Sequence, residues 1–179
     1  MSQPDRRRIL VIDDDRLFLE ITSYHLSRSG YSVEVASDPR QGLHRAIEQS
    51  FDLILLDLMM PELNGAEVLG LLKPLGLQHR VIVVTAHDDD YYRTRARDLG
   101  AAGYVRKPVD PDELQRVVAA TLGSIEDSGS PEGPARRPGL AGALAGRVFD
   151  EPAKDGLQQA VGVGLVASLI AVLVWLIFD

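Results

Sequence analysis

The stretch Ile9-Leu10-Val11-Ile12-Asp13-Asp14-Asp15 decides the fold class of this chain. Its four consecutive apolar side chains are typical of a strand that is buried on both faces, and the aspartates end that strand. The pattern returns at Leu53-Ile54-Leu55-Leu56, which ends at Asp57, and at Val81-Ile82-Val83-Val84, which ends at Thr85. Strands that are apolar throughout occur mainly in parallel sheets, because helices there cover both faces.

The segments between these strands carry helical patterns. Two weaker strands are expected at 31–35 and 102–106, and helices at 16–27, from Asp38-Pro39 onward, and at 66–73, 89–99 and 111–122. Asp38 and Asp110 each precede a proline, which pairs an N-cap with a residue suited to the first helical turn. Strand and helix thus alternate five times over residues 8–122. This alternation predicts a five-stranded parallel sheet with helices on both faces, the doubly wound α/β class.

Composition excludes several function classes. The chain has 179 residues and a formal net charge of −7, and it is acidic on both sides of Leu122. An acidic balance argues against a protein that holds nucleic acid by neutralising phosphates. The chain contains no cysteine, which excludes disulfides, thiol catalysis and cysteine-based zinc sites. The start of the chain is polar and basic, without the apolar stretch of a secretory signal, so we expect this part in the cytoplasm.

The C-terminal part of the sequence differs from the rest. Residues 123–156 are rich in Gly and Pro and are expected to form a flexible linker, with a packed irregular extension as the alternative. Residues 157–178 are expected to form a transmembrane helix, since 160–178 lack any charge and are long enough to span a bilayer. A buried core helix and an interfacial helix are the alternatives. Basic residues precede this segment, which places the globular domain in the cytoplasm as a single-pass, tail-anchored membrane protein.

Small residues recur in the apolar segment at a spacing of four. Ala160, Gly164 and Ser168 would let two membrane helices approach closely, which would allow a homodimer. Small residues are also common in membrane helices, so a chance spacing is the alternative interpretation.

Polar residues follow the strands at the positions where ligands bind to an open parallel sheet. Asp13, Asp14, Asp57, Thr85 and Lys107 all stand at carboxyl ends of predicted strands and would meet at one edge. Grouped carboxylates repel each other unless a cation lies between them, and hard oxygen ligands suit Mg²⁺. A lysine and a hydroxyl there could bind phosphoryl oxygens, and a carboxylate could be the nucleophile that forms an aspartyl phosphate. Each residue alone is a weak signal, because acids at strand ends often only cap helices.

The chain resembles the receiver domain of two-component response regulators over residues 8–122. The resemblance rests on the segments 9–15, 55–61 with Asn64-Gly65, 83–86 and 103–108. It implies a CheY-like, flavodoxin-like (βα)₅ fold. It also implies site roles: Asp57 as phosphoacceptor, and Mg²⁺ held by Asp13, Asp14, Asp57 and the main-chain carbonyl of Met59. Thr85 would be the switch hydroxyl, Lys107 the contact to the phosphoryl group and Tyr104 the aromatic switch, and the Lys107–Pro108 bond is commonly cis in the family.

These observations predict a membrane-tethered, single-domain response regulator rather than an enzyme. A histidine kinase or phosphotransfer protein would phosphorylate Asp57, and the output would be a phosphorylation-dependent contact with a protein target near the membrane. No output domain is expected after Leu122. One alternative is a non-catalytic membrane adaptor that uses the fold for docking. Another is an aspartyl-phosphate phosphatase, which would need an acid two residues after the nucleophile, where Met59 stands.

Overall fold

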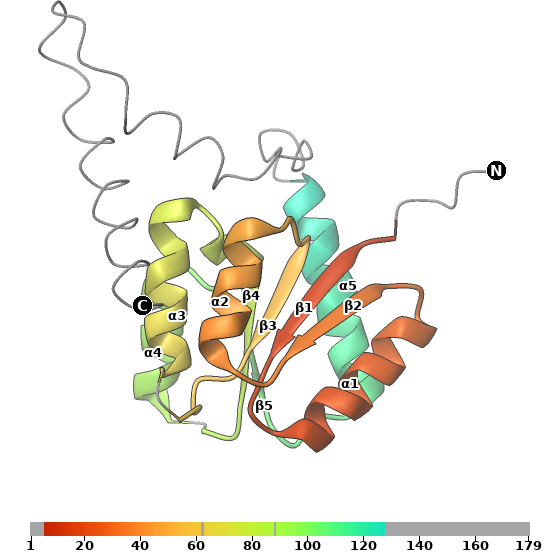
Figure 1. Cartoon of the computed structure of the whole chain (residues 1–179), viewed down its shortest axis with the longest axis horizontal. Coiled ribbons are helices and arrows are strands. Elements are labelled where there is room, and N and C mark those ends of the chain that lie inside the picture. The colour runs from red at the N-terminus through yellow and green to blue at the C-terminus, as the bar shows by residue number, and fades with distance from the viewer. Residues whose placement is uncertain (1–5, 62, 88, 128–179) are drawn as a thin grey trace, which may run out of the picture. The chain divides into compact units, whose positions relative to one another are not determined.

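The computed structural model describes residues 6–61, 63–87 and 89–127. Five parallel strands lie in the order β2-β1-β3-β4-β5, and five helices alternate with them (Figure 1). The strands are β1 (Arg8–Ile12), β2 (Ser32–Ala36), β3 (Leu53–Leu56), β4 (Val81–Thr85) and β5 (Gly103–Arg106). The helices are α1 (Arg16–Arg28), α2 (Pro39–Glu48), α3 (Gly65–Leu72), α4 (Asp90–Asp98) and α5 (Pro111–Asp127), with 3₁₀ turns at Lys73–Leu75 and Gln78–Arg80. The predicted parallel α/β sheet is confirmed.

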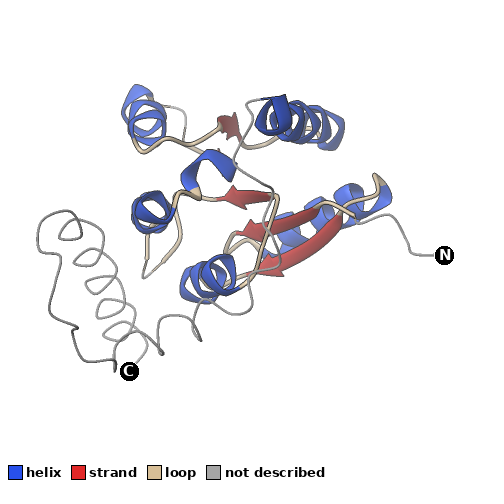
Figure 2. Cartoon of the chain, turned by 90° about the horizontal axis from the view of Figure 1, so that it is seen from above, coloured by secondary structure: helices blue, strands red, loops and turns tan. Residues whose placement is uncertain are grey.

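The sheet separates two hydrophobic cores, and helices cover both of its faces (Figure 2). Because side chains alternate along a strand, Leu10 and Ile12 point to one face of the sheet, and Ile9 and Val11 point to the other. The first core contains buried residues of α2, α3 and α4. The second contains buried residues of α1 and α5. Both faces of the central strands are therefore covered, as their uninterrupted apolar sequence requires.

Helix caps fix where the chain turns from strand to helix at the carboxyl edge of the sheet. The side chain of Asp15 accepts hydrogen bonds from the backbone N–H groups of Leu17 and Phe18 at the start of α1. Asp38 caps α2 in the same way. Asn64 and Glu67 form a reciprocal capping box at the start of α3. These caps satisfy first-turn N–H groups and hold the loops that carry the polar residues of the edge.

The last helix is longer than the sequence pattern indicated. We expected α5 to end at Leu122 and a linker to begin at 123, but α5 continues to Asp127. Gly123 suggested a stop, yet it lies in the helix interior, where a single glycine costs only about 1 kcal/mol. Ile125 packs against the second core, and Glu126 pairs with Arg7. These tertiary contacts compensate for the glycine, so the predicted boundary is wrong by five residues.

The remaining C-terminal predictions lie outside the described residues. These are the linker after Asp127, the transmembrane helix at 157–178 and the small-residue spacing within it. Among the helices of the described part of the chain, none combines the length and the apolar character needed to cross a membrane.

Candidate functional site

Two buried carboxylates form the centre of the site. Asp13 and Asp57 directly follow the neighbouring strands β1 and β3, and only 1% and 7% of their surfaces are exposed. Backbone hydrogen bonds continue past the strand ends: the Asp57 N–H donates to the carbonyl of Ile12 at 3.0 Å, and the Asp13 N–H donates to Ala36 at 3.1 Å. The sheet itself therefore positions both side chains.

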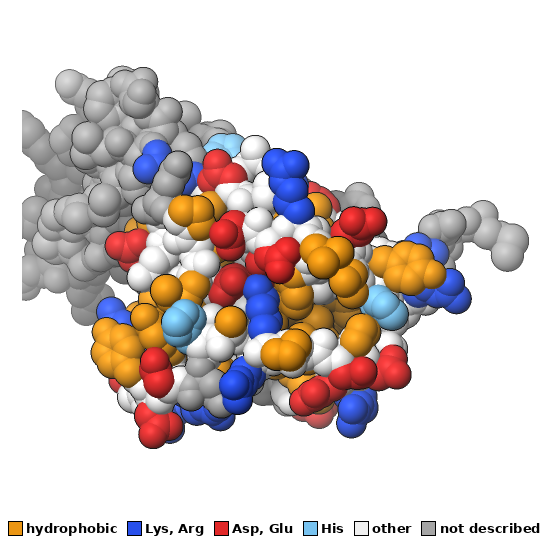
Figure 3. Space-filling model, turned by 90° about the horizontal axis from the view of Figure 1, so that it is seen from below, with side chains coloured by type: hydrophobic (Ala, Val, Ile, Leu, Met, Phe, Trp, Pro, Cys, Tyr) orange, Lys and Arg blue, Asp and Glu red, His pale blue; other side chains and the backbone are white. Residues whose placement is uncertain are grey.

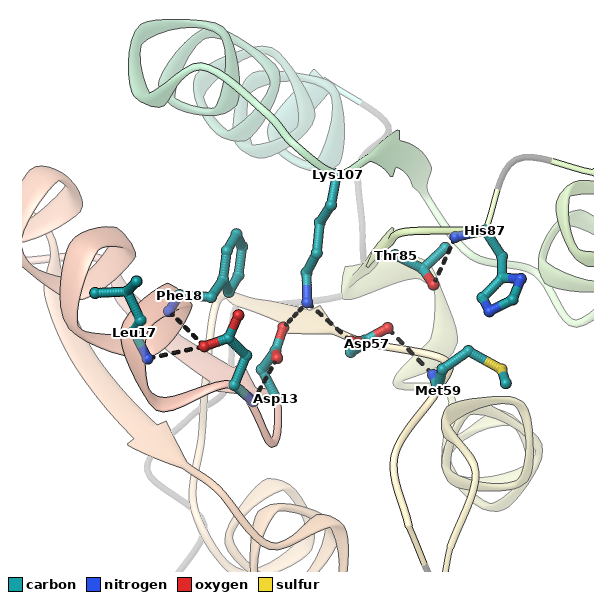
Figure 4. Close-up of polar contacts among 9 residues, drawn as sticks. Asp13, Leu17, Phe18, Asp57, Met59, Thr85, His87 and Lys107 are labelled. Atoms are coloured by element: carbon teal, nitrogen blue, oxygen red, sulfur yellow. Dashed lines mark hydrogen bonds and ion pairs between the residues drawn. The ribbon is translucent and has the colours of Figure 1, made fainter.

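Lys107 reaches these carboxylates from the far edge of the sheet, just after β5. Its Nζ donates to Asp13 Oδ2 at 2.5 Å and to Asp57 Oδ2 at 2.8 Å (Figure 4). The Lys107 N–H donates to the carbonyl of Thr85 at 2.8 Å, and the Lys107–Pro108 peptide bond is cis, as the resemblance implies. The ammonium thus lies between two acids that come from strands β1 and β3.

The protonation equilibria of this cluster are shifted by burial and by mutual contact. Burial raises the pKa of Asp13 to about 6, although the hydrogen bond and charge of Lys107 oppose that rise. Burial alone would lower the pKa of Lys107, but its hydrogen bonds to Asp13 and Asp57 and their charges raise that pKa overall. The lysine therefore stays charged at neutral pH and partly neutralises the two acids.

A third carboxylate completes an acidic cluster that could hold a cation. Oxygen atoms of Asp13, Asp14 and Asp57 lie within 4.8 Å of one another, and Asp14 is exposed. The second oxygen of each buried acid is held by the backbone: the Asp15 N–H donates to Asp13 Oδ1 at 3.0 Å, and the Met59 N–H donates to Asp57 Oδ1 at 3.1 Å. Hard oxygen ligands held in place, with one of them open to solvent, fit Mg²⁺. The predicted role of the Met59 carbonyl stays a prediction.

Thr85 and Tyr104 lie on the next two strands. Thr85 is fully buried, and its Oγ1 accepts a hydrogen bond from the His87 N–H at 3.4 Å (Figure 4). The Tyr104 hydroxyl donates to the His87 carbonyl at 2.5 Å, and the Arg93 guanidinium lies 5.2 Å from the centre of the Tyr104 ring. The segment after β4 therefore contacts both predicted switch residues.

Gly65 and Phe18 were not recognised from the residue pattern as parts of the site. A Cβ atom at Gly65 would lie 1.9 Å from the backbone oxygen of Asp57, so only glycine lets α3 start this close to the acid. The ring centre of Phe18 lies 4.3 Å from Lys107 Nζ. No local sequence signal distinguishes Phe18 from an ordinary core residue of α1, because its contact is made across the fold.

Comparison with known proteins identifies the family. The model of the response regulator receiver domain matches residues 9–119. The chain belongs to this family. Receiver domains bind Mg²⁺ at an acidic pocket, and the corresponding cluster here consists of Asp13, Asp14 and Asp57.

Curated relatives and solved structures agree with this assignment. The chain is 38% identical over 116 residues to the alkaline phosphatase synthesis transcriptional regulatory protein PhoP of Bacillus subtilis, covering 65% of this chain and 48% of that protein. It is 41% identical over 115 residues to the response regulator MprA of Mycolicibacterium vanbaalenii, covering 64% of this chain and 50% of that protein. This receiver therefore spans about half the length of these relatives. A solved CheY-like receiver domain protein from Methanospirillum hungatei is 31% identical, with a TM-score of 0.67, covering 70% of this chain and 100% of that one.

Proposed function

We propose that this receiver accepts a phosphoryl group on Asp57 and that the resulting change of state alters a protein contact made near a membrane. The observation that carries the proposal is the contact of Lys107 Nζ with both Asp57 and Asp13. It leaves Asp57 as a buried carboxylate at the mouth of a cation site, next to a fixed positive charge. That environment suits a nucleophile that attacks phosphorus.

The transfer exchanges one bond to phosphorus for another. An Asp57 oxygen forms the new O–P bond while the donor's N–P bond breaks, and the electron pair stays on the donor histidine, which takes up a proton. A bound Mg²⁺, held by Asp13, Asp14 and Asp57, would supply positive charge against the phosphoryl oxygens. Lys107 lies within reach of the same oxygens, so its ammonium can exchange the carboxylate contact for a phosphoryl contact.

A groove beside the site offers a surface for the donor protein. Its volume is about 440 Å³, and it lies between α1 and the loop that precedes α5. Leu17 and Ile21 of α1 line it with Lys107, and they are 63% and 43% exposed. Figure 3, which views the molecule from below, shows hydrophobic and acidic side chains together on this side. An apolar surface next to the nucleophile is suited to a partner that brings its phosphohistidine to Asp57, namely a histidine kinase or phosphotransfer protein.

The response would pass through Thr85 and Tyr104. A phosphoryl group adds about two negative charges and three acceptor oxygens, so Thr85 and Lys107 gain hydrogen bonds only in the phosphorylated state. Thr85 is already tied to the His87 N–H, and Tyr104 to the His87 carbonyl. A movement of the segment after β4 would therefore change the orientation of the Tyr104 ring and, with it, the adjacent surface of α4.

Membrane tethering and a protein target complete the proposal. The uncharged segment 160–178 supports a tail anchor, and the acidic composition on both sides of Leu122 supports a protein rather than a nucleic-acid contact. Two of the relatives described above are named a transcriptional regulatory protein and a response regulator, but this receiver spans only about half of each. An anchored receiver would act as a binding protein, not as an enzyme, and its tail helices could pair as a homodimer.

The decisive experiment is phosphorylation of the fragment 1–127. This fragment contains both hydrophobic cores and all the residues that match the receiver-domain family. The match to the Methanospirillum receiver domain protein covers 70% of this chain and the whole of that protein. Acetyl phosphate with Mg²⁺ should give a base-labile phosphoprotein on a phosphate-affinity gel. Asp57→Asn should abolish the band, whereas Asp38→Asn should leave it unchanged, because asparagine also caps a helix well. If the wild-type fragment stays unphosphorylated with acetyl phosphate and also with histidine kinases as donors, the proposal is refuted and the adaptor alternative is favoured.

The anchor needs a separate test. Carbonate-washed membranes should retain the full chain and release the fragment 1–127, and equal extraction of both would refute tethering.

A further inference from the structure

We propose that Phe18 is a positioning residue for Lys107, and that its aromatic face holds the lysine ammonium between the acids of the site. The inference rests on the proposed phosphorylation of Asp57 and extends it to a residue on α1. The ring centre lies 4.3 Å from Nζ, well inside the distance of about 6 Å at which a cation is attracted to an aromatic face.

The contacts around the ammonium define what the ring does. Nζ has three N–H groups, and Asp13 and Asp57 accept two of them at 2.5 and 2.8 Å. The ring covers a further side of the nitrogen (Figure 4), and 14% of the lysine side chain is exposed. A lysine side chain has four rotatable bonds, so its position depends on the contacts that its ammonium makes. The Phe18 ring adds a third contact to those of the two carboxylates.

The position of the ring is itself fixed by the fold. The Phe18 N–H donates to the capping oxygen of Asp15 at 3.2 Å, which anchors the residue in the first turn of α1. The side chain packs against the second core. Because the helix cap fixes the backbone of Phe18 and the second core packs against its side chain, the ring can restrain a mobile partner at little entropic cost.

The restraint on the Lys107 ammonium affects the rate of phosphoryl transfer, because the ammonium must contact the phosphoryl oxygens as the new O–P bond forms. An ammonium already held beside Asp57 needs only a local exchange of contacts to reach the phosphoryl oxygens. A more mobile ammonium would lower the maximal rate but leave the binding of a small donor unchanged. Phe18 therefore contributes to the rate of phosphoryl transfer although it is not expected to touch the phosphoryl group.

The test compares Phe18→Leu with Phe18→Tyr in the fragment 1–127, with acetyl phosphate as donor, because a small donor does not depend on the protein-docking groove. Phe18→Leu keeps an apolar side chain and removes the ring, and it should lower the maximal phosphorylation rate about three- to tenfold, the effect of a partly buried cation–π contact. The half-saturating donor concentration should stay unchanged. Phe18→Tyr should restore the rate. Tyr24→Leu, which removes a ring 5.6 Å from Arg28 elsewhere on α1, is the matched control and should have no effect.

Two further measurements separate positioning from a general structural role. In a Lys107→Gln background, Phe18→Leu should change the rate less than about 1.5-fold, since the ammonium it positions is gone. An equal loss in both backgrounds, or no rescue by tyrosine, would overturn the proposal.

Proton NMR of the unphosphorylated fragment tests the contact without any phosphoryl transfer. The Lys107 ε-methylene protons should show an upfield ring-current shift that Phe18→Leu removes and Phe18→Tyr keeps. If that shift is absent from the wild type, the positioning role is refuted. If it is present while acetyl phosphate gives no phosphoprotein, the proposed function fails and the contact stands.

Discussion

Replacing Gly65 by alanine should disrupt the fold next to the phosphoacceptor. The added Cβ would lie 1.9 Å from the Asp57 carbonyl oxygen and 2.8 Å from both the Asp57 carbonyl carbon and the Leu58 Cα. All three are backbone atoms, so no side-chain rotation relieves the contact. An ordinary carbon–oxygen contact needs roughly 3.2 Å, so the start of α3 must move more than about 1 Å away from β3.

That displacement breaks specific interactions. The Gly65 N–H donates to the Leu58 carbonyl at 2.9 Å, and the residues that follow, Val68 and Leu69, are fully buried in the first core. Overpacking in such a place costs about 3 kcal/mol or more. For a domain of this size the loss corresponds to a fall in the unfolding midpoint of about 10 °C or more.

Gly70→Ala is the matched control, because it makes the same chemical change within the same helix. A Cβ atom at Gly70 meets nothing within 4 Å, and alanine is preferred over glycine inside a helix by about 0.5–1 kcal/mol. Urea unfolding of the fragment 1–127 should therefore show Gly65→Ala strongly destabilised and Gly70→Ala unchanged or slightly stabilised. Equal stability of the two variants would show that the close approach of α3 to Asp57 is not as described.

Three further changes have defined outcomes. Burial raises the pKa of Asp13 from 3.8 to about 6. Between these two pH values the Asp13 carboxyl is protonated in the folded domain and ionised in the unfolded chain, so the free energy of unfolding falls as the pH rises from 3.8 to about 6. Asp13→Asn should stabilise the metal-free domain by about 2–3 kcal/mol at pH 7.5 and about 1 kcal/mol at pH 4.5 in urea unfolding with EDTA; equal destabilisation at both would contradict this. Asp15→Ala should cost about 1 kcal/mol in the same assay, and Asp15→Asn much less, since only alanine removes the cap of α1. Tyr104→Phe removes the bond to the His87 carbonyl and should increase exchange between ring rotamers in NMR relaxation, with the unfolding midpoint as control; an unchanged ring would argue against that bond as a restraint.

The strands were predictable because their sequence has one physical interpretation. A run such as Leu53-Ile54-Leu55-Leu56, bounded by polar residues, can be accommodated only where both faces are covered. The carboxyl ends of parallel strands share one edge, so the meeting of Asp13, Asp57 and Lys107 also followed from the order of the elements.

Other features depended on tertiary contacts that local patterns do not encode. The end of α5 was missed because Ile125 gains its stabilisation from the second core, which a glycine-based stop signal does not include. The contact of Phe18 with Lys107 joins α1 to the loop after β5. The requirement for Gly65 arises from a backbone atom of Asp57, eight residues earlier. The hydrophobic periodicity of the sequence contains no information on how closely two backbone segments approach.

The division of the interior into two cores has a consequence for assembly. The groove beside Asp57 is built on α1 and the start of α5, whereas Tyr104 and α4 pack with the core on the opposite face of the sheet. If the donor binds in the groove as proposed, it would leave the α4 side uncovered. Donor and target would then not compete for one surface, so the receiver could be phosphorylated while it remains bound to its target, and signalling would proceed within a ternary complex instead of through exchange of partners.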